Sequence, residues 1–393
     1  MAKVEAYVPP EDPDFEKLAY TGYQAWQRDK PDLIAYDTVT HGLAFYDAAF
    51  CFTAAWYRPD GGIEAHYFEL DKFDSRKGVS NMLLYGTILV GHNLKFDMQK
   101  AMLGGLLSRD LLFPGRIHDT ETLAHLDDEH RPNGLKDLMV SVLGYEDTID
   151  VEIKSGPNKG TFKKVPREKA EMDAVRRKLK LTVNDPWSLL PRAVILPYAV
   201  ADARGTLELY TKLRPLVERY DDLWSLYQQE LELTLVLLDM EQQGLGLVTS
   251  YVDKQVKVYG MRVLEHENTI EQIVGKPVRT GYIPPKEKDK FFNPASNKQL
   301  AEFFKAAGFE RDSYDKSVLK DIDHPLAPAL TEMRGDAKLL NTYFRAMKAE
   351  ARDGPDRSVC GGGFRLSRGI SCVCGCTLHD HHHHHRNRYL DCD

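Results

Sequence analysis

The sequence predicts an α/β fold in which a mixed β-sheet is flanked by helices and is followed by an all-helical region. Three observations support this prediction. Strand-like runs fill residues 33–70, short strands then alternate with helical segments, and long amphipathic patterns occupy residues 223–353. The chain has 393 residues, which is long enough for two or three domains with hydrophobic cores of their own.

Three strands form the start of the predicted sheet. They are residues 33–37 (LIAYD), 50–57 (FCFTAAWY) and 63–70 (IEAHYFEL), and turn signals separate them near His41 and Gly61. Consecutive strands joined by short turns predict an antiparallel meander.

Shorter strands alternate with helices after the meander. Strands are expected at residues 87–91 (TILVG) and 116–119 (RIHD), and a helical stretch follows each of them. Residues 133–144 (NGLKDLMVSVLG) have the pattern of a short amphipathic helix. This alternation predicts that helices cover the faces of a mixed sheet.

A basic insertion is expected at residues 151–190. Residues 151–180 contain ten lysines and arginines against four acidic residues. One interpretation is a solvated insertion that carries a charged helix. The other is a basic flap over a polyanion such as nucleic acid.

The pattern becomes helical from about residue 223, and we place a domain boundary near residue 222. Apolar residues at spacings near 3.5 form one stripe at Leu226, Leu233, Leu237 and Met240. A second long helix is expected at residues 249–274, and another covers residues 326–351. Between them, either Ser296 or Asn297 is expected to cap a short helix.

Composition restricts the class of protein. The net charge of −7 argues against a general nucleic-acid coat, although it allows a local basic groove. No apolar run reaches 18 residues and residues 1–16 lack the apolar core of a signal peptide, so we expect a cytoplasmic protein with no membrane partner. Cys51 is the only cysteine in the first 359 residues, which fits a reducing compartment.

Four aspartates occupy positions that suggest chemistry. Asp37 ends the first strand, Asp97 follows a buried strand, Asp119 ends the next strand, and Asp202 lies four residues after Tyr198. A single aspartate at a strand end is more often a capping or turn residue. Several carboxylates from separate segments, however, match the oxygen ligands of a two-magnesium site. A tyrosine one helical turn before an acid can orient an attacking water.

Four segments resemble the 3′–5′ proofreading exonuclease domain of the family A DNA polymerases. They are YDTVTHGL, GHNLKFD, IHDTETLAHL with NGLKDL, and YAVADARGTLELY, and together they span about residues 30–220. The resemblance implies a ribonuclease H-like fold for residues 1–222.

The resemblance also implies roles for individual residues. Asp37, Asp97 and Asp202 are the implied metal ligands, and these three acids together with Tyr198 are the implied catalytic residues. The implied cofactor is Mg²⁺ in a two-ion site, for which Mn²⁺ can substitute. Asp37 and Asp202 would share one ion, and Asp37 and Asp97 would hold the other.

The sequence departs from the family two residues after Asp37, where the family has a glutamate and this chain has Val39. Valine offers no ligand oxygen, so we expect a weakened exonuclease. The alternative is that Val39 belongs to the core and that another residue, Glu121, supplies the acid. In the same DTET segment, Asp119 and Thr120 are expected to cap and support the helix that follows them.

Residues 223–353 resemble the thumb of the same family, which implies that these helices lie over duplex DNA. Contacts to nucleic acid are predicted from Arg334 and Lys338 in this region, and from Asn93 and Lys95 in the second exonuclease motif. A solvated helix surface is the alternative for the helical region.

The resemblance ends near Gly354. The palm and fingers of the family do not follow, and residues 354–393 instead carry a cysteine- and histidine-rich tail that is expected to be disordered or out of frame. A separate polypeptide supplying palm and fingers is the implied route to polymerase activity, which we do not expect from this chain alone.

The resemblance therefore predicts a truncated, phage-like polymerase that acts as a 3′–5′ exonuclease in a bacterial or phage-infected cell. Its partner would be a single-stranded DNA 3′ end or primer-template DNA. Two alternatives stay open: a non-catalytic binder of single-stranded 3′ ends, and a free-standing ribonuclease of the same superfamily.

Overall fold

A computed structural model describes most of the chain. The described residues are 10–42, 47–84, 88–154, 156–182, 185–244, 246–280, 287 and 290–353. The predicted tail at residues 354–393 lies outside them. In the part of the chain that the structure describes, no helix is both long enough and apolar enough to cross a lipid bilayer.

The chain divides into two compact units, Met1–Gln242 and Gln243–Asp393. This division lies about twenty residues beyond the boundary expected near residue 222. The helix α8, Asp221–Gln243, explains the difference, because its buried side chains Tyr227 and Leu231 belong to the core of the first unit.

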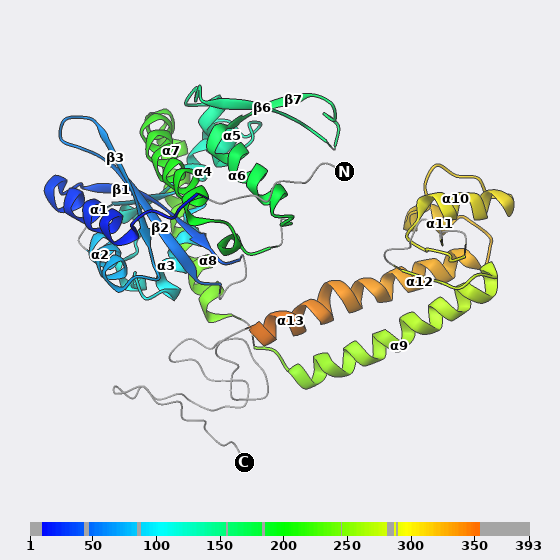
Figure 1. The fold of residues 1–393 in the computed structure, drawn as a ribbon. Coiled ribbons are helices and arrows are strands. Elements are labelled where there is room, and N and C mark those ends of the chain that lie inside the picture. Colours follow the sequence, from blue (N-terminus) through cyan, green and yellow to red (C-terminus); the bar gives the residue numbers. More distant parts are fainter. Residues whose placement is uncertain are drawn as a thin grey trace, which may run out of the picture. The chain divides into compact units, whose positions relative to one another are not determined.

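The first unit is built on a five-stranded mixed sheet with the strand order β3-β2-β1-β4-β5 (Figure 1). Its strands are β1 (Leu33–Thr40), β2 (Ala49–Tyr57), β3 (Ile63–Glu69), β4 (Ile88–Gly91) and β5 (Ile117–Asp119). β1, β2 and β3 form the predicted antiparallel meander, whereas β4 and β5 run parallel to β1. The mixed sheet predicted from the sequence is therefore confirmed.

Helices flank this sheet, as the alternating pattern predicts (Figure 1). The α-helices of the unit are α1 (Phe15–Asp29), α2 (Phe73–Leu84), α3 (Leu94–Leu103), α4 (Thr120–Asp127), α5 (Leu135–Ser141), α6 (Arg167–Lys178), α7 (Arg192–Glu218) and α8. Short 3-10 turns occur at η1 (Arg109–Leu111), η2 (Pro114–Arg116) and η3 (Trp187–Leu189). Neither α1 nor α2 was predicted from the sequence.

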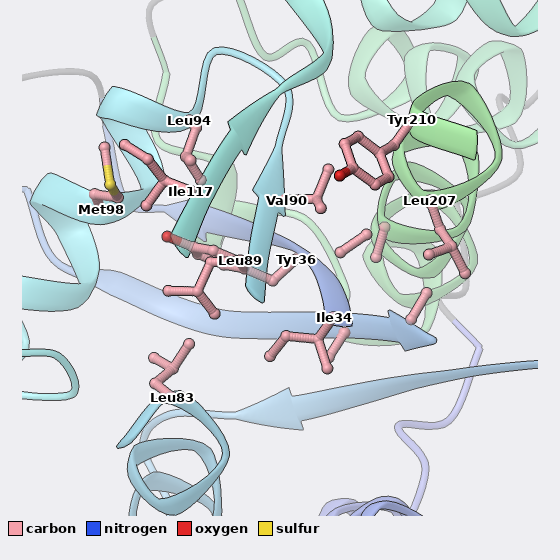
Figure 2. Packing of buried hydrophobic residues seen from close by; sticks show 14 of the residues in the cluster. Ile34, Tyr36, Leu83, Leu89, Val90, Leu94, Met98, Ile117, Leu207 and Tyr210 are labelled. Carbon is pink, nitrogen blue, oxygen red and sulfur yellow. The ribbon is translucent and has the colours of Figure 1, made fainter. Parts of the chain in front are cut away.

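The core of the first unit joins the sheet to its helices. Figure 2 shows Ile34 of β1 and Val90 of β4 near Leu207 and Tyr210 of α7. The side chains of Ile34, Val90 and Leu207 are completely buried, and burial of each aliphatic side chain stabilises the fold by about 1.5–3 kcal/mol. This packing fixes α7 against the strands, which matters because α7 carries two of the predicted catalytic residues.

The apolar stripe predicted on α8 is wrong. Leu226, Leu233, Leu237 and Met240 are exposed, and the buried face consists of Tyr227, Leu231, Leu235 and Leu238. Both sets recur at helical spacing, so periodicity alone does not distinguish them. The polar hydroxyl of Tyr227 settles the choice by accepting a hydrogen bond from the backbone N–H of Asp119, at 3.0 Å.

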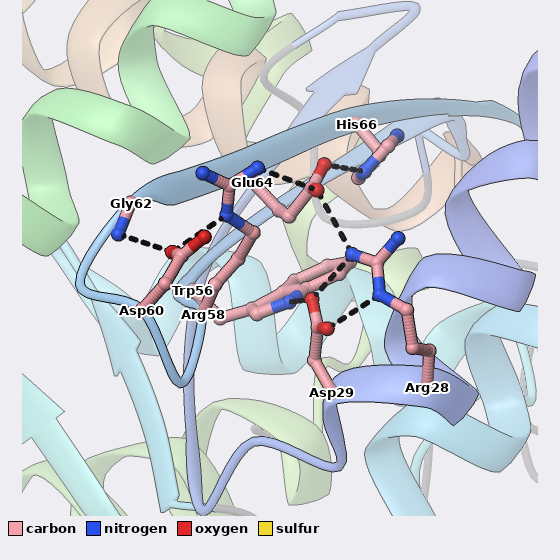
Figure 3. Close-up of polar contacts among 8 residues, drawn as sticks. All are labelled: Arg28, Asp29, Trp56, Arg58, Asp60, Gly62, Glu64 and His66. Atoms are coloured by element: carbon pink, nitrogen blue, oxygen red, sulfur yellow. Dashed lines mark hydrogen bonds and ion pairs between the residues drawn. The ribbon is translucent and has the colours of Figure 1, made fainter.

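A network of charged groups fastens the end of α1 to strands β2 and β3 (Figure 3). The Asp29 carboxylate accepts hydrogen bonds from Arg28, at 2.7 Å, and from the Trp56 indole, at 3.0 Å. Glu64 accepts a hydrogen bond from Arg28 at 3.0 Å and contacts His66 at 2.9 Å. Asp29 and Glu64 therefore join α1 to β2 and β3, which is a structural role.

The basic insertion folds as a β-hairpin followed by a helix. Strands β6 (Thr148–Glu152) and β7 (Phe162–Pro166) pair antiparallel, and α6 follows them directly. The buried side chain of Met172 anchors α6 in a small cluster that also contains Ile195 and Ala199 of α7. The insertion is therefore an ordered layer packed on α7.

The second unit is helical, as predicted. It comprises α9 (Thr249–Val274), α10 (Asn297–Ala306), α11 (Lys316–Leu319), α12 (Leu326–Lys338), a π-helical segment (Leu339–Phe344) and α13 (Arg345–Asp353). The bounds of α9 agree with the predicted helix, and Ser296 caps α10 by accepting a hydrogen bond from the Gln299 N–H. A separate apolar cluster that includes Ile270, Phe304 and Leu330 forms its core.

Candidate active site

Asp37 lies on the strand in the middle of the sheet. It occupies β1 opposite Thr53 of β2, near the carboxyl end of a strand that runs parallel to β4 and β5. The carboxyl ends of parallel strands meet at one edge of a sheet, so residues in or after these strands are brought together there.

Asp97 reaches the same edge from the first turn of α3. Its Oδ1 accepts hydrogen bonds from the Thr38 N–H, at 2.9 Å, and from the Thr38 hydroxyl, at 2.6 Å. The side chain is almost completely buried. These two bonds fix the Asp97 carboxyl beside β1 and next to Asp37.

Tyr198 and Asp202 come from α7, which crosses the same region. The Thr53 hydroxyl donates a hydrogen bond to the Ala199 carbonyl at 3.0 Å and so joins α7 to β2. One helical turn separates Tyr198 from Asp202, and the pKa of the Tyr198 hydroxyl is raised by burial and by the nearby charge of Asp202. The structure thus brings together the four residues predicted to be catalytic.

The three carboxyl groups are close enough to interact electrostatically. Burial raises the pKa of Asp37, and the neighbouring charges of Asp97 and Asp202 raise it further. Burial also raises the pKa of Asp202, and it raises that of Asp97 to about 7. Like charges in a buried site favour protonation unless a cation compensates them.

The chemistry of this donor set fits a hard divalent cation. Three carboxylates offer only oxygen ligands, which Mg²⁺ prefers. Among the described residues, however, no three acids, histidines or cysteines stand in an arrangement ready to enclose an ion. Asp37, Asp97 and Asp202 would hold the metal, and their mutual repulsion is what a bound cation would relieve.

Two further charged residues lie in the site, and sequence reasoning missed both. The Lys136 ammonium of α5 is 2.5 Å from Asp202 Oδ1 and 3.3 Å from Glu168 Oε1 of α6. It also lies over the Tyr198 ring, 4.3 Å from the centroid. The one available signal was a lysine within the apolar helix pattern of NGLKDL.

Close packing of α5 on α7 sets the position of Lys136. A Cβ atom at Gly205 of α7 would lie only 2.8 Å from Met139 Sδ of α5, so a larger residue there would require the Met139 side chain to move. Lys136 lies three residues before Met139 and Asp202 three residues before Gly205, which places both near this contact.

A cavity of about 630 Å³ opens beside these residues. Its wall includes Asp37, Tyr198, Asp202, Lys136, Glu121 and Asn93, together with the basic side chains Lys163, Lys164, Lys169 and Arg177 of the insertion. The insertion therefore brings basic side chains to the cavity wall, where Lys163 pairs with Asp137 and Lys169 pairs with Asp173. The flap over a polyanion stays a prediction.

Val39 is part of the core. Its side chain is buried in the apolar cluster with Cys51, Ile195 and Ala199, and it offers no oxygen to the site. Glu121, the alternative acid, lines the cavity, and burial raises the pKa of its carboxyl group. The charges that raise the pKa of Asp37, after burial, are those of Asp97 and Asp202.

Asp119 has the predicted capping role. Its carboxylate accepts hydrogen bonds from the backbone N–H groups of Glu121, at 2.8 Å, and of Leu94, at 2.7 Å. It is the N-cap of α4, and it also ties the start of α3 to β5. Thr120 supports this corner by donating a hydrogen bond to the Gly91 carbonyl.

The predicted nucleic-acid contacts have different surroundings. Asn93 lines the cavity, whereas Lys95 forms an ion pair with Glu241 of α8. The Arg334 guanidinium donates hydrogen bonds to two backbone carbonyls in its own unit, which indicates a structural role. Lys338 is exposed, and its contact to nucleic acid stays a prediction.

The buried carboxyls predict that stability without metal falls as pH rises. The pKa of Asp97 is raised from 3.8 to about 7, so its protonated form favours the folded state. That stabilisation is complete below about pH 4 and is lost as pH rises through about 7, at about 1.4 kcal/mol per pKa unit.

Thermal unfolding followed by circular dichroism between pH 5 and 8.5 measures this effect. We expect the melting temperature to fall with pH in EDTA and to recover when Mg²⁺ is added. The Asp97→Asn variant should show a flatter profile. A pH-independent melting temperature of the unmodified chain in EDTA would contradict the prediction.

Comparison with known proteins agrees with this geometry. Residues 23–218 match a family model described as 3′–5′ exonuclease. A DNA polymerase of Escherichia phage T5 is 28% identical over 277 residues, covering 65% of this chain and 29% of that protein. DNA polymerase I of Chloroflexus aurantiacus is 27% identical over 275 residues, covering 65% of this chain and 24% of that protein.

Two more distant similarities cover more of the chain. The DNA polymerase DpoZ of Vibrio phage phiVC8 is 23% identical over 335 residues, which are 80% of this chain and 49% of that protein. The solved structure of the POL domain of Pol1 from M. smegmatis, in complex with DNA primer-template and dNTP, aligns with a TM-score of 0.54. It shares 17% identity and covers 90% of this chain and 51% of that one. The similarity to the M. smegmatis structure indicates a shared fold.

The chain spans less than half the length of the curated relatives it matches. The match to the family model nevertheless covers the sheet, the helices α3 to α7 and the four predicted catalytic residues, of which Asp37, Tyr198 and Asp202 line the cavity. Residues 23–218 of this chain are a 3′–5′ exonuclease domain of the type found in DNA polymerase I-like, family A DNA polymerases.

Proposed function

We propose that this chain removes nucleotides from the 3′ ends of DNA by metal-dependent hydrolysis, at a rate reduced by Val39. One observation carries the proposal. Asp37, Asp97 and Asp202 converge in an exonuclease domain, beside a cavity that the basic insertion lines. The relatives come from phages and bacteria, which supports a cytoplasmic site of action in a bacterial or phage-infected cell.

The carboxylates would hold the metal in pairs. Asp37 with Asp97, and Asp37 with Asp202, are the pairs suited to a divalent ion, with Mg²⁺ as the cofactor and Mn²⁺ as a substitute. The bound metal would stabilise the charge that develops on the phosphate oxygens during displacement.

Tyr198 would orient the attacking water. Burial raises the pKa of the Tyr198 hydroxyl, so the phenol stays neutral and is no general base. The neutral phenol can donate its proton to an acceptor and can accept a hydrogen bond from water through its oxygen. This contact would direct a lone pair of the water toward the phosphorus atom.

The direct test is digestion of a 5′-labelled single-stranded DNA in Mg²⁺. We expect slow shortening from the 3′ end, seen as a ladder of products, and no shortening in EDTA. The Asp97→Asn variant keeps the size of the side chain and should be inactive. Cleavage from the 5′ end, or equal activity of this variant, would refute the proposed function.

The basic side chains in the cavity wall predict that the binding of single-stranded DNA depends on salt concentration. Lys163 and Lys164 line the cavity, and each phosphate contact to single-stranded nucleic acid contributes roughly 0.7 to the slope of log K against log salt. We expect Lys163→Ala with Lys164→Ala to lower this slope by roughly 1.4 in fluorescence anisotropy between 50 and 300 mM salt. Lys72→Ala, at an exposed lysine outside the cavity wall, is the matched control. An unchanged slope would exclude the insertion from strand binding.

A second function is favoured by Val39 and Lys136. A site that lacks one ligand oxygen and contains an internal ammonium group could bind a 3′ end without cleaving it. Binding of the labelled strand with the predicted salt dependence, but without any Mg²⁺-dependent product, would identify this function.

A further inference from the structure

The Lys136 ammonium lies between two carboxylates that belong to different helices. It is 2.5 Å from Asp202 Oδ1 of α7 and 3.3 Å from Glu168 Oε1 of α6. The side chains of Lys136, Asp202 and Glu168 are only 15%, 6% and 10% exposed. The Tyr198 ring covers the ammonium, with its centroid 4.3 Å away. One amino group therefore connects a predicted metal ligand to the first turn of the helix in the basic insertion.

The two contacts of the ammonium differ in kind. The ammonium donates a hydrogen bond to Glu168. Asp202 Oδ1, by contrast, is buried and has no hydrogen-bond partner among the described residues, so its contact with the ammonium is an ion pair alone. A buried oxygen without a hydrogen bond is costly, and a hard divalent cation is a partner that such an oxygen prefers. Asp202 is thus the contact that the ammonium can lose, and Glu168 is the one that it can keep.

The ammonium and a divalent ion would act on the same carboxyl groups. Burial raises the pKa of both Asp202 and Asp37, and the positive charge of Lys136 lowers both. A divalent ion held by these carboxylates would also favour their ionised forms. The ammonium fills the space beside Asp202 Oδ1, where a Mg²⁺–oxygen bond of about 2.0–2.1 Å would have to form. The two cations therefore compete for one oxygen atom.

The packing of α6 on α7 fixes the position of Glu168. Glu168 lies one helical turn before Met172, so the two side chains share one face of α6. Met172 is completely buried in the cluster that contains Ile195 and Ala199 of α7. This anchor keeps the first turn of α6 next to α7 and the Glu168 carboxylate within reach of the ammonium.

We propose that Glu168 is a positioning residue, which holds the Lys136 ammonium when a divalent ion replaces this ammonium on Asp202. Glu168 acts through Lys136 and does not itself touch the ion. The inference rests on the proposed metal-dependent function and gives the basic insertion a second role in it, since α6 supplies Glu168. Metal binding is then an exchange of partners: the ammonium leaves Asp202 and keeps Glu168.

The affinity of the full chain for Mn²⁺ tests this proposal. It is measured by the electron paramagnetic resonance signal of free Mn²⁺ at pH 7.5. The double variant Asp37→Asn with Asp202→Asn gives the background, which includes ions bound by the histidine-rich tail. Lys136→Met removes the competing ammonium and should tighten binding about tenfold. Glu168→Gln leaves Asp202 as the one carboxylate that pairs with the ammonium, and it should weaken binding about tenfold.

A double variant separates the exchange from a simple effect of charge. Without an ammonium to hold, Glu168 has no role, so adding Glu168→Gln to Lys136→Met should change the affinity by less than about twofold. A carboxylate that attracted the ion through its own charge would give the same loss in both backgrounds. Glu171→Gln is the matched control, because it removes the same charge from an exposed position on α6 and should leave the affinity unchanged.

The proposal fails if folded Lys136→Met binds Mn²⁺ no more tightly than the unmodified chain. It also fails if Glu168→Gln weakens binding equally with and without Lys136. If Glu168→Gln does not fold, Glu168→Asp takes its place, with a smaller loss expected because the shorter side chain withdraws the carboxylate. Failure of the proposed function is a separate result. A chain that shows these affinities but never shortens DNA refutes the exonuclease, and a chain that shortens DNA without this coupling refutes only the role of Glu168.

Discussion

Replacing Val39 by glutamate is expected to increase the rate of 3′-nucleotide release on the order of 10²–10⁴-fold. The missing ligand oxygen is expected to forfeit roughly 3–5 kcal/mol of transition-state stabilisation, and about 1.4 kcal/mol corresponds to a factor of ten in rate. Val39 lies two residues after Asp37 on β1, so both side chains point to the same face of the sheet.

The same substitution should destabilise the metal-free protein. Val39 is buried with Cys51 and Ile195, and an ionised carboxylate among them is disfavoured without a cation. We therefore expect Val39→Glu to unfold at a lower temperature than the unmodified chain in EDTA and to gain more stability from Mg²⁺.

Single-turnover digestion of a 5′-labelled strand measures the gain. Val39→Gln is the matched control, because glutamine has the same shape as glutamate and lacks its charge. The rate of 3′-nucleotide release should increase far less in this variant than in Val39→Glu. Val39→Glu combined with Asp202→Ala should be inactive. If Val39→Glu brings no gain, or if the unmodified chain already digests DNA as fast as this variant, then Val39 does not occupy a ligand position.

Replacing Asp119 by alanine is expected to lower the free energy of unfolding of the first unit by about 3–5 kcal/mol. The carboxylate accepts hydrogen bonds from the N–H groups of Asn93, Leu94 and Glu121, at 3.1, 2.7 and 2.8 Å. Each buried donor left without a partner costs about 1–3 kcal/mol. The loss should also disorder the start of α3, which carries Asp97.

Thermal melting measures this loss. For a unit of this size, about 2–4 °C corresponds to 1 kcal/mol, so we expect a decrease of roughly 6–20 °C. Asp119→Asn keeps an acceptor oxygen and should be milder. The control is Asp128→Ala, which removes an exposed carboxylate that accepts from the His130 N–H and should cost less than about 1 kcal/mol. If Asp119→Ala and Asp128→Ala lowered the melting temperature by similar amounts, this result would show that Asp119 acts only as a helix cap.

Local sequence pattern determined much of the fold. Alternation and turn residues predicted the meander of β1, β2 and β3, and helical periodicity predicted α9 with its observed bounds. These features depend on neighbours within a few residues, which are visible in the sequence. The positions of Asp37, Asp97 and Asp202 were visible through the resemblance of their motifs. The structure places Asp37 within β1, which continues to Thr40 and so extends beyond the strand predicted to end at Asp37, and it places Asp97 in α3 and Asp202 in α7.

Tertiary structure decided what lies opposite each of these segments. Two apolar stripes on α8 fit a helix equally well, and only the packing of Tyr227 against β5 selects the buried one and moves the boundary to Gln242. Periodicity describes one helix and contains no information about its partner.

The site shows the same division between sequence and tertiary structure. The sequence shows a valine, not an acid, two residues after Asp37, but the position of the Lys136 ammonium on Asp202 depends on how α5 packs on α7 near Gly205. That contact joins residues about sixty-six positions apart, which no local pattern encodes. Charge compensation in a buried site is a property of distances in space, so only the folded chain could decide it.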